Sequence, residues 1–324
     1  MSQTETAGQS IVEENGVATF WRRQRQWSIL ADRLKSRVGF WRSTMLILSA
    51  SGVLLQTLAA ALSKSWVGPV AGVIGAVALV FVPFIARQFL TAERVRGWLR
   101  ARSVSEGLKS QIYRYCANAE PYTGADRASK LSEIGKKTEV WADELALELA
   151  DIEADTRPPP GPLDAASYLR ARVTDQIESY YRRHARLNAR LAKIFRNLEL
   201  ASTATAALLG SLASALQLRG AAGSAPGSIG AWVGVLTTIG AGLAAHAAAN
   251  RYDQQARMYF ATARQLEDLR REWIDKGRPT DAKGWSEFVT ACEEAISAEN
   301  RGWMAKLDVE EKLSTAAPPT STAH

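Results

Sequence analysis

Four long stretches of this chain contain no Asp, Glu, Lys or Arg, and they constrain its fold more than any other feature. They cover about residues 43–63, 65–86, 200–218 and 229–249. A helix rises about 1.5 Å per residue, so roughly 20 residues cross a hydrocarbon core of about 30 Å. The pattern predicts four membrane-crossing helices that form two hairpins. The alternative is that a stretch forms a buried core helix of a soluble protein. This alternative carries more weight for the second pair, where Ala and Gly dominate.

Arg and Lys flank these hairpins on one side only. Cations precede the first and third stretches and follow the second and fourth, whereas the two hairpin loops hold only Lys64 and Arg219. Segments rich in Arg and Lys stay in the cytoplasm, so both termini and the central segment are predicted to be cytoplasmic. The first forty residues lack the apolar run of a cleaved signal peptide, so the first spanning helix is expected to act as the insertion signal. The predicted fold class is an all-α membrane protein, with two tandem two-transmembrane helical hairpins and long cytoplasmic helical extensions.

The two hairpins are predicted to be copies of one duplicated unit. Phe20-Trp21-Arg22-Arg23 recurs about 160 residues later as Tyr180-Tyr181-Arg182-Arg183. After each hairpin, an aromatic residue precedes a Glu by eight positions, as Trp98 and Glu106 and again as Tyr259 and Glu267. The predicted domains are therefore a disordered N-terminus (1–19), a first repeat (20–156), a Pro-rich linker (157–163), a second repeat (164–311) and a disordered tail (312–324).

Apolar residues at alternating spacings of three and four mark the helices beside the spans. The clearest seam precedes the third span and consists of Ile177, Tyr180, His184, Leu187, Leu191, Ile194 and Leu198. This spacing places one stripe on one helix face and is typical of a coiled-coil contact. His184 lies on the seam, where a polar residue that sets the register is the favoured interpretation. A homo-oligomer is expected, with the lipid bilayer as the other partner of the chain.

The sequence contains no recognisable catalytic constellation. Gly135-Lys136-Lys137 resembles the end of a P-loop, but Lys137 replaces the Ser or Thr that the loop requires. The three histidines and two cysteines show no metal-ligand spacing, and both cysteines fall in segments predicted to be cytoplasmic, so neither a metal site nor a disulfide is expected. The net charge is +7, but the cations flank the apolar stretches, which favours an anionic membrane face over nucleic acid. We therefore expect no enzyme activity, no cofactor and no nucleic-acid partner.

Small and polar residues inside the spans are the candidate functional residues. They share one helix face in each span: Ser49, Gly52, Gln56, Ala59 and Ser63; Gly68, Gly72 and Gly75; Thr203, Ala207, Gly210, Ser214 and Gln217; Gly230, Gly234, Thr237 and Ala241. Close helix packing in lipid is one explanation of these faces, and a weakly polar lumen between assembled chains is the other. The candidate pore-lining residues are Gln56, Thr203, Gly210, Ser214, Gln217 and Thr237. His246 and His184 are candidates for a gate or an interface.

The layout resembles the SLATT family, the SMODS- and SLOG-associating two-transmembrane effector domain. The resemblance covers roughly residues 20–115 and 165–310 as a tandem pair. It rests on an aromatic and basic helix (Tyr180 to Arg183), two spans with a short loop, a following helix with Tyr259, Glu267 and Trp273, and a closing helix with Glu299, Asn300 and Trp303. The resemblance implies a protein of the bacterial inner (plasma) membrane that acts as a pore-forming effector in defence. It also implies a trigger from a nucleotide-signalling partner protein, and it offers no catalytic residues.

Two functions remain open at this point. The first is a regulated oligomeric pore or membrane-disrupting effector, lined by the second hairpin, which has fewer large aliphatic residues than the first. The second is a non-conducting membrane scaffold whose helical stalks recruit a cytoplasmic partner. A transporter ranks third, because both hairpins enter from the same side and an inverted repeat is excluded.

Overall fold

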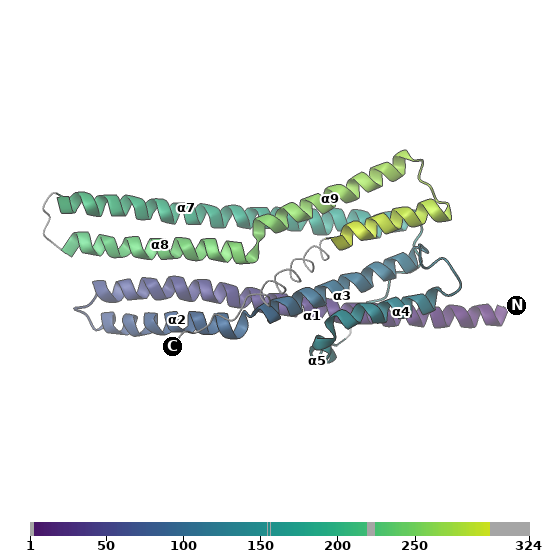
Figure 1. Ribbon diagram of the computed structural model, residues 1–324, viewed down its shortest axis with the longest axis horizontal. Helices are drawn as coiled ribbons and strands as arrows, with labels where there is room; N and C mark the ends of the chain where they lie inside the picture. The colour runs from purple at the N-terminus through teal and green to yellow at the C-terminus, as the bar shows by residue number, and fades with distance from the viewer. Residues whose placement is uncertain (1–2, 154, 156, 219–223, 299–324) are drawn as a thin grey trace, which may run out of the picture. The chain divides into compact units, whose positions relative to one another are not determined.

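The computed structural model describes residues 3–153, 155, 157–218 and 224–298 (Figure 1). The expected closing helix around Glu299, Asn300 and Trp303, the tail 312–324 and the loop residues 219–223 lie outside the described residues. The labelled α-helices are α1 (Gln3–Ala61), α2 (Val67–Phe89), α3 (Ala92–Cys116), α4 (Arg127–Glu139), α5 (Ala146–Ala150), α6 (Ala165–Tyr168), α7 (Arg183–Leu218), α8 (Ser224–Asn250) and α9 (Tyr252–Asp275).

Three further segments are helical but are wound more tightly or more widely than an α-helix. A 3-10 helix, η1 (Val140–Leu145), joins α4 to α5, and two π-helical segments, η2 (Leu169–Thr174) and η3 (Gln176–Arg182), lead into α7. A further helix covers residues 282–298. The described residues form no strand, so the predicted all-α class is confirmed.

In the part of the chain that the structure describes, four helices are long and apolar enough to cross a membrane, as predicted. Their limits differ from the predicted ones, because α1 ends at Ala61, α2 begins at Val67, and α8 already begins at Ser224. The helix α1 also begins at Gln3, whereas disorder was expected over residues 1–19. This stretch contains no proline, and extending an existing helix costs far less than starting one. Val17 is buried in a core cluster, which anchors this part of α1.

The chain divides into two compact units that cut across the expected repeats. Within the described residues, the hairpin unit contains 36–92, 184–218 and 224–257, and the helical unit contains 3–35, 93–153, 155, 157–183 and 258–298. Helical arms of both repeats therefore belong to one unit, whereas the start of α7 belongs to the hairpin unit. The short helical arms of one repeat bury little apolar surface by themselves, and a shared core removes more of it from water.

The core of the helical unit forms where α1, α3, η1 and α5 meet. Trp27 and Leu30 of α1 are buried there with Val104 and Leu108 of α3. A second cluster joins Val17 to a group on α3 and α4: Ile112, Tyr115 and Leu131, with Tyr122 from the loop between them. Helix α4 approaches α1 closely at Gly135, where an added Cβ would lie 2.3 Å from the Phe20 ring.

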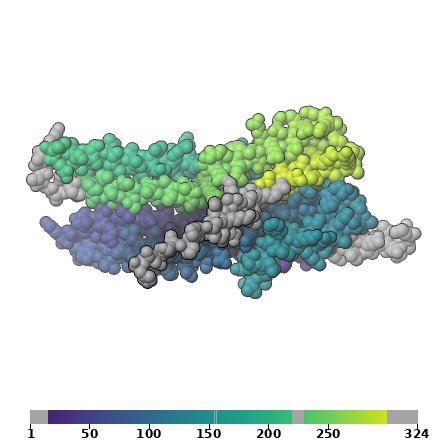
Figure 2. Space-filling model, in the orientation of Figure 1, coloured from purple at the N-terminus to yellow at the C-terminus, as the bar shows by residue number. Residues whose placement is uncertain are grey.

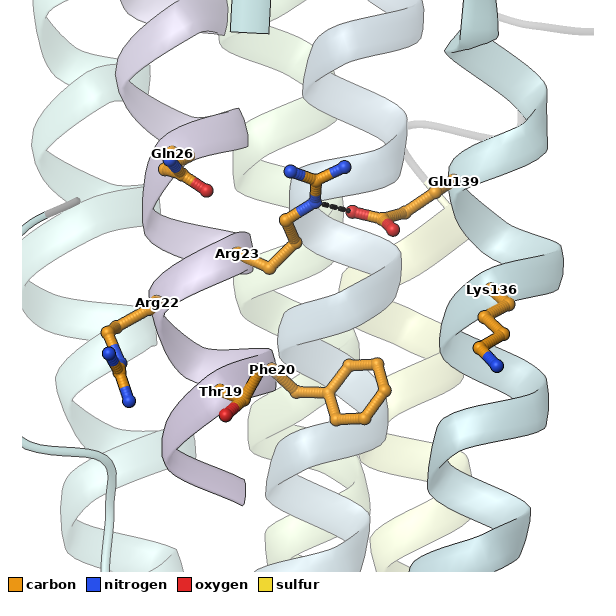
Figure 3. Close-up of a pocket in the computed structure, with 7 residues that line it drawn as sticks. All are labelled: Thr19, Phe20, Arg22, Arg23, Gln26, Lys136 and Glu139. Atoms are coloured by element: carbon orange, nitrogen blue, oxygen red, sulfur yellow. Dashed lines mark hydrogen bonds and ion pairs between the residues drawn. The ribbon is translucent and has the colours of Figure 1, made fainter. Parts of the chain in front are cut away.

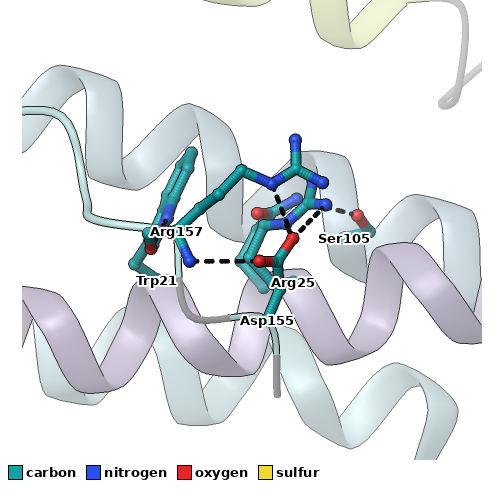
Figure 4. Close-up of polar contacts among 6 residues, drawn as sticks. Trp21, Arg25, Ser105, Asp155 and Arg157 are labelled. Carbon is teal, nitrogen blue, oxygen red and sulfur yellow. Dashed lines mark hydrogen bonds and ion pairs between the residues drawn. The ribbon is translucent and has the colours of Figure 1, made fainter. Parts of the chain in front are cut away.

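The Pro-rich linker is fixed to the first repeat by polar contacts (Figure 4). Arg25 of α1 forms an ion pair with Asp155 (2.8 Å), and the indole of Trp21 donates a hydrogen bond to the Arg157 carbonyl (3.1 Å). After the prolines, the Leu163 amide donates to the Cys116 carbonyl at the end of α3 (2.8 Å). The linker thus follows a defined path over α1 and α3.

The helix pairs beside the two hairpins have nearly the same antiparallel register. In the second repeat, Arg182 pairs with Glu267. In the first repeat, Gln24 donates a hydrogen bond to Ser105 (3.1 Å), and this pair lies within two positions of the residues that the repeat aligns with Arg182 and Glu267. The two helix pairs therefore share nearly the same register, and the duplication itself stays a prediction. Glu106, which the repeat aligns with Glu267, instead pairs with Arg102 on its own helix (3.1 Å).

Candidate pore-lining faces of the hairpins

The small-residue faces of the first hairpin pack against each other. An added Cβ at Gly52 would lie 2.7 Å from Leu79 of α2, and one at Gly75 would lie 2.9 Å from the Gly52 carbonyl oxygen. Gln56 donates its amide hydrogen bond to the Gly72 carbonyl at 2.8 Å. A mid-membrane amide needs a partner, and α2 supplies it within the same hairpin. The structure therefore gives Gln56 a packing role inside the first hairpin.

Helix α7 in the second hairpin has three distinct sides. Its buried side holds Ser202, Ala206 and Ala213, which pack within the hairpin unit. The predicted lining residues Thr203, Ser214 and Gln217 are exposed, and Gly210 is half-buried. They follow one another at helical spacing, so they form one uncovered polar side. Leu200, Leu208 and Leu212 are exposed on a third, apolar side.

Helix α8, like α7, has a buried side and an exposed side. Val235 and Gly240 are buried, and an added Cβ at Gly240 would lie 2.7 Å from the Ser202 hydroxyl oxygen. The predicted face of α8 is exposed instead, with Gly230, Gly234, Thr237 and Ala241 all uncovered. An added Cβ at Gly230 or Gly234 would meet no atom within 4 Å. Both helices of this hairpin reach the molecular surface (Figure 2).

The hydroxyl groups on these faces are satisfied within their own helices. Ser214 donates to the Gly210 carbonyl (3.0 Å), and Thr237 donates to the Val233 carbonyl (2.8 Å). Such bonds to the carbonyl four residues earlier leave the hydroxyl oxygen able to accept a hydrogen bond. The uncovered sides are therefore weakly polar and can contact either water or another helix without an unpaired donor.

His246 lies in an aromatic cluster next to the joint between α8 and α9. Its ring centroid is 4.9 Å from that of Phe195 on α7, and its Nε2 is 3.4 Å from the Tyr252 hydroxyl. Asn250 at the end of α8 accepts a hydrogen bond from Arg42 of α1 (3.4 Å). Arg251 then has a φ of 51°, in the left-handed region that L residues rarely adopt. The cluster thus packs around the end of the fourth membrane helix.

His184 lies at the start of α7, and its carbonyl accepts a hydrogen bond from the Asn188 amide (2.8 Å). It is half-buried, and the side of α7 that carries Ala185 and Asn188 is the buried one. Three residues of the predicted seam, Leu187, Ile194 and Leu198, are exposed. This chain therefore leaves much of the seam uncovered.

A buried ion pair in the helical unit was not predicted. Arg172 of η2 contacts Glu293 of the 282–298 helix through two hydrogen bonds (2.8 and 2.7 Å), and both side chains are almost completely buried. Tyr168 donates a third hydrogen bond to Glu293 (3.0 Å), and the Tyr113 ring lies 4.4 Å from the Arg172 guanidinium. The proximity of Glu293 outweighs burial and holds the pKa of Arg172 above its ordinary value.

Glu106 lies in the same charged region. Burial raises its pKa, but the positive charges of Arg102, Lys109 and Arg172 outweigh that effect and lower the pKa to about 2. Glu106 is therefore a stable anion inside the helical unit. One sequence signal points to such buried charge: Glu293 lies within the apolar run formed by Phe288, Val289, Cys292 and Ile296.

A groove between α1 and α4 is lined by basic, acidic, neutral polar and aromatic side chains (Figure 3). Its volume is about 550 Å³, and its walls include Phe20, Arg23, Lys136 and Glu139. Glu139 accepts hydrogen bonds from Arg23 Nε (2.6 Å) and from the Trp27 indole (2.7 Å). Over the described ranges, no three His, Cys, Asp or Glu side chains come together as metal ligands. Cys116 and Cys292 are buried free thiols, and burial raises the pKa of Cys116 to about 11.

Two family models match parts of the chain. Residues 168–303 match the model described as SMODS and SLOG-associating 2TM effector domain 1. Residues 25–130 match another model, described as Protein of unknown function (DUF4231). No curated protein and no solved structure matches the chain. The predicted resemblance is confirmed for the second repeat: its hairpin and flanking helices match the SLATT family of membrane effector domains.

Proposed function

We propose that this protein is a membrane effector of a bacterial defence system and that it forms a conducting homo-oligomer in the inner membrane. The observation that carries the proposal is the uncovered polar side of the second hairpin. Thr203, Ser214 and Thr237 are exposed on it, whereas the equivalent small residues of the first hairpin are used in packing. The SLATT match implies a membrane effector in defence-related systems.

Several chains are needed for a conducting path. Four helices enclose little space, and Gln56 is already bonded to α2 within the first hairpin. A lumen would therefore form between copies, with the polar sides of α7 and α8 facing inward and the leucine-bearing side of α7 facing lipid or a neighbouring helix. A ring of hydroxyl groups holds water only while the gate is open, since a narrow apolar pore empties by dewetting.

In this proposal, both termini and the helical unit lie in the cytoplasm. The distribution of Arg and Lys around the hairpins supports this orientation. The trigger would come from a nucleotide-signalling partner protein, an expectation supported by the family description of a domain that associates with SMODS and SLOG. The joint at Arg251, next to His246, would transmit movement of α9 to α8.

A non-conducting scaffold is the second candidate. The observation that favours it is the exposed seam on α7, with Leu187, Ile194 and Leu198 uncovered. In that case the hairpins serve as an anchor, and the uncovered polar side packs against other membrane helices without water.

Cysteine accessibility separates the two candidates. Single replacements Thr203→Cys, Ser214→Cys and Thr237→Cys place thiols on the uncovered polar side, and Leu209→Cys and Leu216→Cys place them on half-buried positions of α7. The native cysteines are buried, so their background reaction with a water-soluble thiol reagent is small. A pore predicts fast reaction of the first group in the active oligomer and slow reaction of the second. Equal protection of both groups would favour the scaffold.

A further inference from the structure

The exposed face of η1 and α5 combines large apolar side chains with acids. Val140, Trp141 and Leu147 are each at least 65% exposed. The opposite face of the same segment, with Ala142, Leu145, Leu149 and Ile152, is buried in the core of the helical unit. The segment is thus packed on one side and leaves an apolar strip uncovered on the other.

Acidic residues surround this strip. Residues 138–156 contain Glu139, Asp143, Glu144, Glu148, Asp151, Glu153 and Asp155 but no Lys or Arg, in a chain whose net charge is +7. Asp143, Glu148, Asp151 and Glu153 are exposed and form no ion pair with any described residue. We call Val140, Trp141, Leu147 and these four acids the acidic patch.

The first half of α7 has the complementary composition. Residues 183–198 contain Arg183, Arg186, Arg190, Lys193 and Arg196 but no Asp or Glu. All five cations are exposed, and none forms an ion pair with a residue in the described part of the chain. Leu187, Ile194 and Leu198 are each at least 50% exposed on the same helix. Arg183, Leu187, Arg190 and Ile194 follow one another at spacings of four, three and four, so they share one face, which we call the basic stalk.

Lipid headgroups can account for only part of the basic stalk. The third apolar stretch begins near Leu200, and the polar layer on each side of the hydrocarbon core is about 5–8 Å thick. At about 1.5 Å per residue, Arg190 lies roughly 15 Å along α7 from Leu200, and Arg183 lies roughly 25 Å from it. The helix continues without interruption over its 36 residues. Arg183 and Arg190 therefore lie beyond the headgroup layer, so their positive charge is available to another anionic surface.

We propose that the acidic patch of one copy docks on the basic stalk of the next copy. Both surfaces combine exposed apolar residues with charges, and the charges of the two surfaces are of opposite sign, as is common in protein interfaces. The contact joins two different surfaces, so it repeats in one direction from copy to copy and closes into a ring when the rotation allows. The inference rests on the proposed homo-oligomer and specifies which surfaces build it.

Reciprocal charge reversal tests this contact in the full-length protein in detergent. The patch variant carries Glu148→Lys and Asp151→Lys, and the stalk variant carries Arg183→Glu and Arg190→Glu. The patch variant cancels the net charge of the four patch acids, and the stalk variant places acids opposite acids, so each variant alone is expected to associate about tenfold more weakly than the wild type. An equal mixture restores assembly, because the two new lysines of one variant then face the two new glutamates of the other. Native mass spectrometry measures the species present.

A variant with Asp126→Lys and Glu133→Lys is the matched control, because these exposed acids, just before α4 and within it, lie outside the acidic patch. It changes the net charge as the patch variant does and is expected to assemble like the wild type. Failure of the mixture to restore assembly would overturn the inference, and so would a monomeric wild type. Loss of binding to anionic-lipid vesicles by the stalk variant, with assembly unchanged, would assign the stalk to lipid and overturn it. Weaker assembly of the patch variant alone, with the stalk variant unchanged, would place the patch against a surface other than the basic stalk, with the same consequence.

The outcomes for this contact and for the pore are separable. If both reversed variants assemble and conduct normally, the interface lies elsewhere and the proposed function stands. If the mixture restores assembly but no preparation conducts, the contact stands and the pore fails.

Discussion

The buried ion pair between Arg172 and Glu293 makes a quantitative prediction. Glu293→Ala removes three hydrogen bonds, two from Arg172 and one from Tyr168, and leaves the guanidinium charge without its carboxylate. Breaking one partner of a buried pair costs about 3–5 kcal/mol, because the remaining charge stays desolvated. For a folding unit of roughly 150–250 residues, this corresponds to a thermal midpoint lower by about 10 °C.

The double variant Arg172→Met with Glu293→Leu is the control for this prediction. It removes both charges and fills the space with apolar atoms, which is often neutral for stability. We expect it to regain most of the loss. Tryptophan fluorescence during thermal unfolding in detergent is a suitable assay, because Trp285 lies 5.6 Å from the Tyr168 ring. A double variant as unstable as Glu293→Ala, or a single variant that costs under about 1 kcal/mol, would refute the reasoning.

Three further predictions follow from other parts of the chain. Gly135→Ala should destabilise the helical unit by about 1 kcal/mol net, because the clash with Phe20 outweighs the gain in helix propensity; an unchanged urea midpoint would contradict this. The Glu106 pKa of about 2 lies below the ordinary value of 4.5, so its contribution is complete above about pH 4.5 and is lost as the pH falls towards 2. Glu106→Gln should make the free energy of unfolding less dependent on pH in this range. Tryptophan fluorescence during acid titration measures the change. Reporter fusions should read external at Lys64 and cytoplasmic at Thr123, and the reverse result would overturn the topology.

The membrane helices could be predicted from sequence because their signal is local. A helix of about 20 uncharged residues is long enough to cross the hydrocarbon core and bonds its own backbone groups. It meets both requirements whatever it packs against. The limits of the helices could not be predicted as well, since α1 extends back to Gln3 and α8 begins at Ser224. Both helices begin before the apolar stretches that they contain, so the hydropathy of the sequence does not fix these ends.

The role of each polar span residue depended on packing, which the sequence does not specify. Gln56 and Ser214 look alike as polar residues on small-residue faces. The first bonds to the Gly72 carbonyl of the neighbouring helix, and the second bonds to the Gly210 carbonyl of its own helix and remains exposed. The difference arises from which faces of two helices meet, a tertiary property that helical spacing does not determine.

The Arg172–Glu293 pair was missed for a related reason. Charged residues on helices usually lie on the solvated face, and these two are 121 positions apart in the chain. Only the position of Glu293 among apolar residues distinguished it. Both residues belong to the second repeat, and they meet because η2 packs against the 282–298 helix, a tertiary contact that the sequence pattern does not specify.

Ion flux from liposomes tests the central claim most directly. The comparison uses wild type, Ser214→Leu and Thr205→Leu, each reconstituted as the intact oligomer. Both variants replace an exposed hydroxyl residue of α7 with a larger apolar one, but helical spacing places Thr205 on the side opposite Ser214. The account predicts flux through the wild type and Thr205→Leu and a strong reduction for Ser214→Leu. Absence of flux from the wild-type oligomer under every condition that preserves it, or equal flux from all three proteins, would contradict the account.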